Sequence, residues 1–143
     1  MSVWWLFKLK SQKVETTNIK SVFRGRNYTT EISNGKHQII TDEPTTDGGQ
    51  DQGLNPFELI LAGLATCTTA TLKMYADRKG WKISKINVVL SMSEQTGSQS
   101  IKTDITIEGE ISVEQKARLL LIAKKCPVHK LLSTANQIET ILN

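Results

Sequence analysis

The sequence predicts an α+β fold in which antiparallel sheets pack around long buried helices. Short segments rich in β-branched residues fill residues 13–41, and similar segments recur after Gly80. Between them lies a long run without charge, residues 59–72, whose apolar positions follow a helical period. A chain of 143 residues can bury one core but is short for two. We therefore expect a single domain over residues 1–143.

Three strands are expected first, at residues 13–19, 27–33 and 37–42. Asn34-Gly35 separates the second from the third and is typical of a tight hairpin, so these strands form an antiparallel meander. Residues 43–55 are rich in Gly and Asp and have no apolar period, which indicates a flexible loop. Its acidic residues lack the spacing of a calcium-binding loop.

The residues at positions 55–58 predict the start of a helix. Asn55 can serve as N-cap, Pro56 fits the first helical position, and the Glu58 carboxylate can reach back to the capping N–H group. The helix is expected to run to about Lys79, with Gly80 as its natural stop.

Both faces of this helix are uncharged, so it must be covered nearly all round. One stripe places Cys67 toward the interior. It consists of Ile60, Leu64, Cys67, Thr71 and Tyr75. The opposite side carries Leu61, Ala65, Thr68 and Leu72.

Two further strands are expected at residues 81–94 and 102–112, joined by a polar connection. The alternation in the second strand suits a sheet with one face in water.

A second helix is expected at residues 113–126, where Ala, Leu and Lys predominate. Because Pro127 disfavours helical geometry in the residue before it, Cys126 should end this helix and cap a short one at residues 127–133. A last strand is expected at residues 136–143.

The chain has only two cysteines, Cys67 and Cys126. On an apolar helix face, Cys67 is either a small hydrophobic residue of the core or a reactive thiol. Cys126 is expected at a helix N-terminus, where the helix dipole favours a thiolate, but a structural role is equally open. We expect no export signal, and a cytoplasmic chain with two cysteines more often uses them in catalysis or redox chemistry.

Several other kinds of site are not expected. A metal site built from Cys67, Cys126, His37 and His129 would have only one close pair, Cys126 and His129. No Ser-His-Asp, phosphate-loop or dinucleotide-binding motif is present. A net charge of +4 from scattered lysines gives little support for nucleic-acid binding, and residues 59–72 are shorter than the roughly 20 residues of a membrane span.

Three segments together resemble the OsmC and organic hydroperoxide resistance (Ohr) family. They are "DEP" before the Gly-rich loop, "NPFELILAGLATCTTATLKMYADRKGW", and "LLLIAKKCPVHKLL". The resemblance implies an OsmC-like α+β fold and an intertwined homodimer that encloses the cysteine helices between its sheets. It also implies a peroxiredoxin-like enzyme, active in oxidative stress, that reduces organic hydroperoxides to alcohols without a cofactor.

The resemblance further implies that Cys67 is the peroxidatic thiol and Cys126 the resolving one. Cys67 would form a sulfenic acid and then a disulfide with Cys126, and an external dithiol of lipoyl type or a small thiol would reduce that bond. An apolar surround raises a thiol pKa, so a cation is needed nearby. The family supplies an arginine from its early strands, and both Arg24 and Arg26 are candidates.

One position departs from the family. The hydroperoxide resistance proteins carry a glutamate directly after Asn-Pro that orients the arginine, whereas this chain has Phe57 there. Glu58 lies one residue further, about 100° around the helix. Two alternatives therefore remain beside the peroxidase: a weak or inactive member that binds a hydrophobic ligand in the dimer cleft, and a general disulfide oxidoreductase, which would lack the usual C-x-x-C motif.

Overall fold

The structure is a computed structural model that describes residues 17–143 of the chain. It falls into two compact units, Met1–Pro56 and Phe57–Asn143. The expected single domain over residues 1–143 stays a prediction.

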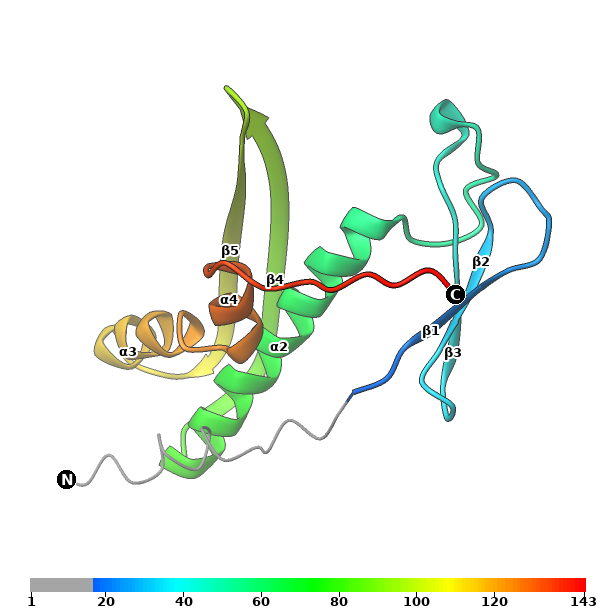
Figure 1. The fold of residues 1–143 in the computed structure, drawn as a ribbon. Coiled ribbons are helices and arrows are strands. Elements are labelled where there is room, and N and C mark those ends of the chain that lie inside the picture. The colour runs from blue at the N-terminus through cyan, green and yellow to red at the C-terminus, as the bar shows by residue number, and fades with distance from the viewer. Residues whose placement is uncertain (1–16) are drawn as a thin grey trace. The chain divides into compact units, whose positions relative to one another are not determined.

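The first unit contains a three-stranded antiparallel sheet in the order β1-β2-β3 (Figure 1). Its strands are β1 (Lys20–Phe23), β2 (Thr30–Ser33) and β3 (Gln38–Thr41). The hairpin between β2 and β3 turns at Asn34, whose side-chain oxygen accepts hydrogen bonds from the N–H groups of Lys36 and His37. An antiparallel meander is therefore confirmed, but its first strand, β1, shares no residue with the strand predicted at residues 13–19.

The first strand differs from the prediction in its position, and the second in its start. Residues 13–16 lie outside the described residues, residues 17–19 are not in a strand, and β1 begins only at Lys20. Lys20 already pairs with Ser33, the last residue of β2, so a longer β1 would meet the turn rather than a partner. Residues 27–29 are also not strand, because Asn27 has a φ of 39° and the Thr29 N–H group closes a turn onto the Arg26 carbonyl.

The loop after β3 is held together by one buried carboxylate. Asp42 is 2% exposed and accepts hydrogen bonds from the N–H groups of Glu43, Gln50 and Gln52 and from the Thr29 hydroxyl. Between these donors the chain forms the short 3₁₀ helix η1 (Thr45–Asp47). The loop is thus more ordered than its composition indicated.

Helix α2 (Pro56–Lys79) belongs to the second unit from Phe57 onward, and its bounds match the prediction. Gly80 follows with a φ of 67°, the left-handed geometry that ends helices. By length and composition α2 could span a membrane, with a mean hydropathy of 1.3 in its most apolar window, but the core helix of a soluble protein passes the same test. The capping roles of Asn55 and Glu58 stay predictions.

A long antiparallel hairpin follows, made of β4 (Lys82–Gln95) and β5 (Ser98–Glu110). The turn contains only Thr96 and Gly97, with φ values of 50° and 77°, whereas the sequence predicted a longer connection. Positive φ at both central residues is the geometry that matches the twist of paired strands. The strands therefore continue almost to the tip.

A β-bulge between Ile83 and Lys85 sets which face of β4 is apolar. After it, the half-buried residues fall on alternate positions: Ile86, Val88, Leu90 and Met92. Opposite the bulge, Gly109 has a φ of 150°, and a Cβ atom there would lie 2.3 Å from the Lys82 carbonyl oxygen. Only glycine fits this position without a shift of the backbone.

Two helices complete the unit, α3 (Val113–Ala123) and α4 (Pro127–Leu132). Helix α3 begins with a capping box, in which Ser112 and Gln115 each accept a hydrogen bond from the other's N–H group. It ends at Ala123, earlier than predicted. Cys126, with φ −53° and ψ 132°, is the N-cap of α4, as expected for a residue before proline.

The predicted strand at residues 136–143 is wrong, since this segment has no regular structure. No β-strand of the described chain pairs with it, and Ile138, Ile141 and Leu142 are 88%, 71% and 99% exposed. An apolar alternating pattern becomes a strand only where another strand satisfies its backbone groups.

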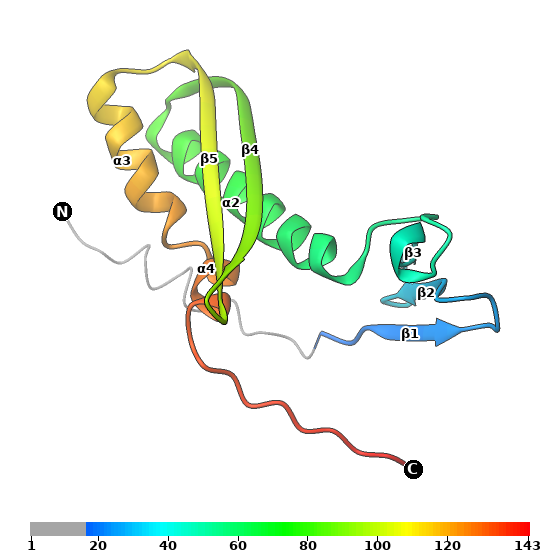
Figure 2. The same cartoon turned by 90° about the horizontal axis from the view of Figure 1, so that it is seen from above.

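Helices α2 and α3 lie along the β4–β5 hairpin (Figures 1 and 2). The helices contribute many of the buried apolar side chains of the unit, among them Leu64, Leu72, Tyr75, Ala76, Leu119 and Ile122. The prediction that α2 is covered nearly all round is not met within one chain, because Phe57, Ile60 and Met74 are 53%, 44% and 51% exposed.

Candidate active site

Two thiols from different helices meet in the second unit. Cys67 lies near the middle of α2 and Cys126 at the start of α4, and their side chains are hydrogen-bonded to each other. Both are free cysteines. A contact between thiols is the arrangement from which a disulfide can form with little movement of the backbone.

The two cysteines differ in their access to water. Cys126 is fully buried, with no exposed surface, whereas Cys67 is half-buried. A reagent from solution can therefore reach Cys67, while Cys126 is shielded. The sequence placed Cys67 on the interior stripe of α2, and the structure leaves part of it open.

Two uncharged donors also face the Cys67 sulfur. They are the backbone N–H group of Val128, in the first turn of α4, and the hydroxyl of Thr71, one turn further along α2. Burial raises the pKa of the Cys67 thiol, and the hydrogen bond with Cys126 raises it further; the bonds from Val128 and Thr71 oppose this by favouring the thiolate. The net direction is upward.

The charged residues named from the sequence lie elsewhere in the chain. Arg24 and Arg26 belong to the first unit, next to the end of β1, and both are exposed. The Arg24 Nε atom pairs with the Glu31 carboxylate at 3.1 Å, whereas Arg26 has no ion pair within the described residues. Glu58 is an exposed residue of the first turn of α2. An effect of either arginine, or of Glu58, on Cys67 stays a prediction.

No cluster of three or more His, Cys, Asp and Glu side chains suited to a metal ion occurs among the described residues. His129 stands in α4 three positions after Cys126.

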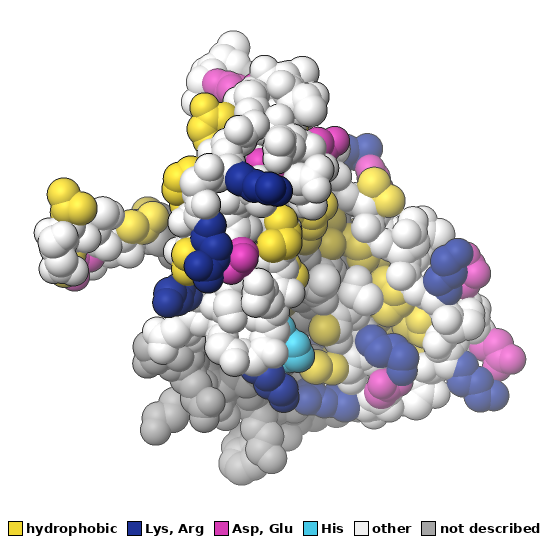
Figure 3. Space-filling model, turned by 90° about the vertical axis from the view of Figure 1, so that its right-hand side faces the viewer, with side chains coloured by type: hydrophobic (Ala, Val, Ile, Leu, Met, Phe, Trp, Pro, Cys, Tyr) yellow, Lys and Arg dark blue, Asp and Glu magenta, His cyan; other side chains and the backbone are white. Residues whose placement is uncertain are grey.

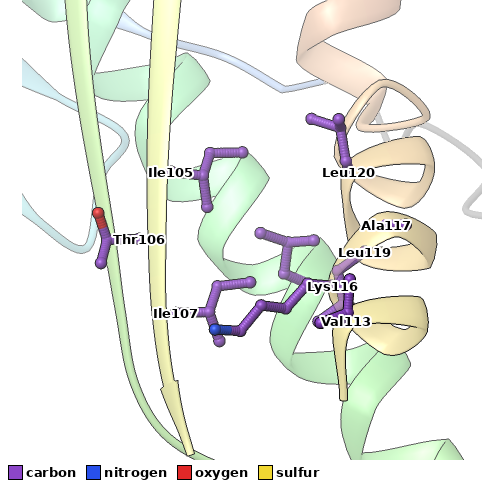
Figure 4. Close-up of a pocket in the computed structure, with 9 residues that line it drawn as sticks. Ile105, Thr106, Ile107, Val113, Lys116, Ala117, Leu119 and Leu120 are labelled. Carbon is purple, nitrogen blue, oxygen red and sulfur yellow. The ribbon is translucent and has the colours of Figure 1, made fainter. Parts of the chain in front are cut away.

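An apolar pocket of about 500 Å³ lies between β5 and α3 (Figure 4), and Leu72 of α2 also lines it. Ile105 and Ile107 face Val113 and Leu120 across it, and the Lys116 side chain reaches toward β5 beside Ile107. Neither cysteine lines this pocket. It is therefore a space for an apolar group apart from the thiol pair.

Sequence reasoning missed two of the groups that contact the Cys67 sulfur. Thr71 lies on the same helical stripe as Cys67, four residues further along, and this i+4 spacing is a signal that the sequence contains. The sequence contains no signal for the Val128 amide, because every residue except proline has a backbone N–H group whatever its side chain.

The comparisons with known proteins agree with this fold. A sequence model of the family described as OsmC-like protein matches residues 49–141. No curated protein matches the chain. Similar solved structures include an OsmC-like protein from Mycoplasma pneumoniae, 23% identical with a TM-score of 0.71, covering 83% of this chain and 88% of that one.

Two further structures are described as organic hydroperoxide resistance proteins. One, from Legionella pneumophila, is 22% identical with a TM-score of 0.61 and covers 85% of this chain and 91% of that chain. The other, OhrB of Bacillus subtilis, is 22% identical with a TM-score of 0.58 and covers 82% and 90%. These likenesses establish the shared fold. Since the family model covers more than half of the sequence and both cysteines, the chain belongs to the OsmC-like protein family.

Proposed function

We propose that this protein is a thiol peroxidase that reduces organic hydroperoxides. The observation that supports it most directly is the hydrogen-bonded pair formed by a half-buried Cys67 and a fully buried Cys126. In such a pair the accessible thiol meets the oxidant and the shielded one resolves the product. Membership of a family whose solved structures include organic hydroperoxide resistance proteins points the same way.

The reaction balances in three steps. The Cys67 thiolate attacks one oxygen of the O–O bond, which breaks; Cys67 becomes a sulfenic acid, and the departing alkoxide takes a proton to leave as the alcohol. The Cys126 sulfur then attacks the Cys67 sulfur, so that a disulfide forms and water leaves. An external dithiol, of lipoyl type or a pair of small thiols, reduces this disulfide and is itself oxidised. No cofactor takes part, and the reducing cytoplasm is the compartment that suits this cycle.

The rate of the first step depends on the ionisation of Cys67. Because burial raises its pKa, the two neutral donors alone leave the thiol mostly protonated near neutral pH. An arginine from the first unit, Arg24 or Arg26, would supply the missing positive charge. This chain has Phe57 in the position of the family's glutamate, so another carboxylate would have to orient that arginine. Glu58 and Glu31 are the candidates.

We also propose that the active form is a homodimer. Large apolar side chains reach the surface in both units, and several are visible on the face in Figure 3. In the second unit they include Val113, Leu121 and Leu131, which are 79%, 52% and 54% exposed. So much exposed apolar surface is typical of a face that another chain covers. Light scattering should give twice the chain mass of 15.9 kDa, and a monomer at micromolar concentration would exclude this assembly.

The peroxidase is tested by a single turnover. Fully reduced protein is mixed with one equivalent of cumene hydroperoxide, quenched with an alkylating agent and digested. We expect a peptide pair joined through Cys67 and Cys126, together with one equivalent of the alcohol. Cys67→Ser should form neither product. Two thiols that remain free while the hydroperoxide persists would refute the mechanism.

A second candidate function is the binding of a hydrophobic ligand without turnover. The apolar pocket between β5 and α3 favours it, because about 500 Å³ is large enough for a small ligand. Titration with a fluorescent fatty-acid analogue should then show saturable binding that Ile107→Asp abolishes. If the protein binds the ligand in this way and its thiols do not react with the hydroperoxide, a ligand-binding function is favoured over the peroxidase.

A further inference from the structure

The threonines of α2 do not all use their hydroxyls in the same way. Thr66 and Thr69 donate to backbone carbonyls one turn earlier, Thr66 to Ala62 at 2.9 Å and Thr69 to Ala65 at 3.0 Å. This is a common arrangement for threonine in a helix. The Thr71 hydroxyl instead faces the Cys67 sulfur.

The geometry of α2 explains this contact. Side chains four residues apart lie on the same face of a helix, one above the other, so Thr71 lies directly beside Cys67. Thr71 is only 8% exposed, and Cys126 closes the site from α4 with no exposed surface of its own. A hydrogen bond here is largely shielded from water, where its electrostatic effect is stronger.

We propose that Thr71 is a positioning residue of this site, whose hydroxyl donates a hydrogen bond to the Cys67 thiolate and favours the ionised form of the sulfur. A hydroxyl beside a neutral thiol gains little, but beside a thiolate it gains a charge-assisted bond. The hydroxyl therefore acts selectively on the form of Cys67 that attacks a peroxide. The proposal rests on the proposed function for its biological meaning, but not for its test.

The expected size of the effect follows from the strength of such a bond. Loss of one hydrogen bond to a charged group should lower the thiolate fraction of Cys67 about tenfold below its pKa. A more basic thiolate is also a better nucleophile, which returns about half of this loss on a logarithmic scale. The observed alkylation rate at a pH below the pKa should therefore fall about threefold.

The experiment compares three variants with the parent protein. Thr71→Val removes the hydroxyl and keeps the shape, Thr71→Ser keeps the hydroxyl, and Thr69→Val removes a hydroxyl that serves the backbone. The rate of iodoacetamide reaction is measured from pH 6 to 10 and read on the Cys67 peptide by mass spectrometry. Cys126 is the titratable side chain that faces Cys67 in the second unit, and every variant keeps it.

We expect Thr71→Val to react about threefold more slowly at pH 7.5, with the midpoint of its pH profile moved upward. Thr71→Ser and Thr69→Val should follow the parent. Should Thr71→Val fail to fold by circular dichroism, Thr71→Ala and Thr71→Ser form a second pair, in which Ala should be the slower.

A profile for Thr71→Val, or for Thr71→Ala where that pair is used, that coincides with the parent's would overturn the proposal. Because alkylation needs no peroxide, this outcome is distinct from failure of the peroxidase. A shifted profile in a protein that leaves hydroperoxide intact would uphold the role of Thr71 and refute the proposed function.

Discussion

The thiol of Cys67 is hydrogen-bonded to the thiol of Cys126, although the two stand on different helices. Because Cys126 is buried and Cys67 is partly exposed, the proposed mechanism assigns attack on the hydroperoxide to Cys67 and resolution to Cys126.

Replacement of Cys126 by serine should arrest the reaction at the sulfenic acid. Without a resolving thiol, Cys67 keeps its oxygen, and dimedone should add once per chain at Cys67 after one equivalent of hydroperoxide. Mass spectrometry of the labelled peptide gives the answer, with Cys67→Ser as the unlabelled control. Equal labelling in the parent and in Cys126→Ser would mean that Cys126 does not resolve the intermediate.

Arg24 is the arginine that we expect to activate Cys67, because the Glu31 carboxylate holds its Nε atom at 3.1 Å. An arginine beside a thiolate lowers the thiol pKa by about one unit or more, so Arg24→Met should slow sulfenic acid formation by roughly threefold or more. Stopped-flow fluorescence with excess hydroperoxide measures this step. Glu31→Gln should also lower the rate of sulfenic acid formation, but by less than Arg24→Met.

Arg26→Met is the matched control, since Arg26 lies two positions away without an ion pair in the described chain. It should react at nearly the parent rate. The reverse order of the two arginine variants would reassign the role to Arg26. The Arg24–Glu31 pair is exposed and adds little stability, so both variants should remain folded.

Asp42 should make the loop of residues 43–55 sensitive to acid. Burial alone would raise the pKa of Asp42, but hydrogen bonds from the N–H groups of Gln50, Gln52 and Glu43 and from Thr29 bring it below its usual value. A depressed carboxyl pKa stabilises the fold above the unfolded value of about 4, and that contribution disappears as the pH falls through the folded pKa. Amide exchange at Gln50 and Gln52 should therefore accelerate at low pH.

Asp42→Asn should remove most of this pH dependence and leave both amides weakly protected even at pH 7. Hydrogen exchange followed by mass spectrometry, corrected for the intrinsic rate at each pH, measures the effect. Asp47→Asn, an exposed change in the same loop, is the control and should behave like the parent. Strong protection of Gln50 in Asp42→Asn would show that the carboxylate does not order the loop.

Tyr75 should contribute to stability through its hydroxyl as well as its ring. Tyr75 is 5% exposed, and its ring packs edge-on against Trp81. Its hydroxyl accepts a hydrogen bond from Arg118 Nε at 3.1 Å, which joins α2 to α3. Tyr75→Phe should lower the free energy of unfolding by about 0.5–1.5 kcal/mol. Urea denaturation measures it, and the exposed Tyr28→Phe should change it by no more than about 0.5 kcal/mol.

The parts of the fold that the sequence predicted well depend on local chemistry. Pro56 and Gly80 mark the ends of α2 because each restricts or permits one backbone geometry, and Asn34-Gly35 marks its turn for the same reason. The Thr96-Gly97 turn was harder to place, since threonine seldom adopts a positive φ. The early end of α3 at Ala123 has no glycine or proline to announce it.

The errors concern interactions between distant parts of the chain. Residues 136–143 have the alternation of a strand, but no local rule supplies a partner. The contact between Cys67 and Cys126 also joins distant parts of the chain, but it is not an error of the prediction. The two residues alone left both roles open, and the resemblance to the OsmC and Ohr family paired them. Thr71 shares a helical stripe with Cys67, which the sequence predicts. That its hydroxyl faces the Cys67 sulfur is known only from the structure.

The contact between Cys67 of α2 and Cys126 at the start of α4 also affects the stability of the second unit. Oxidation would tie the middle of α2 to the start of α4 and enclose the whole β4–β5 hairpin and α3 in a covalent ring. Closing a ring of that length removes chain entropy from the unfolded state worth about 4 kcal/mol. The oxidised protein should therefore melt at a higher temperature than the reduced one. In the proposed cycle, the thermal stability of the second unit would rise when the disulfide forms and fall again when it is reduced.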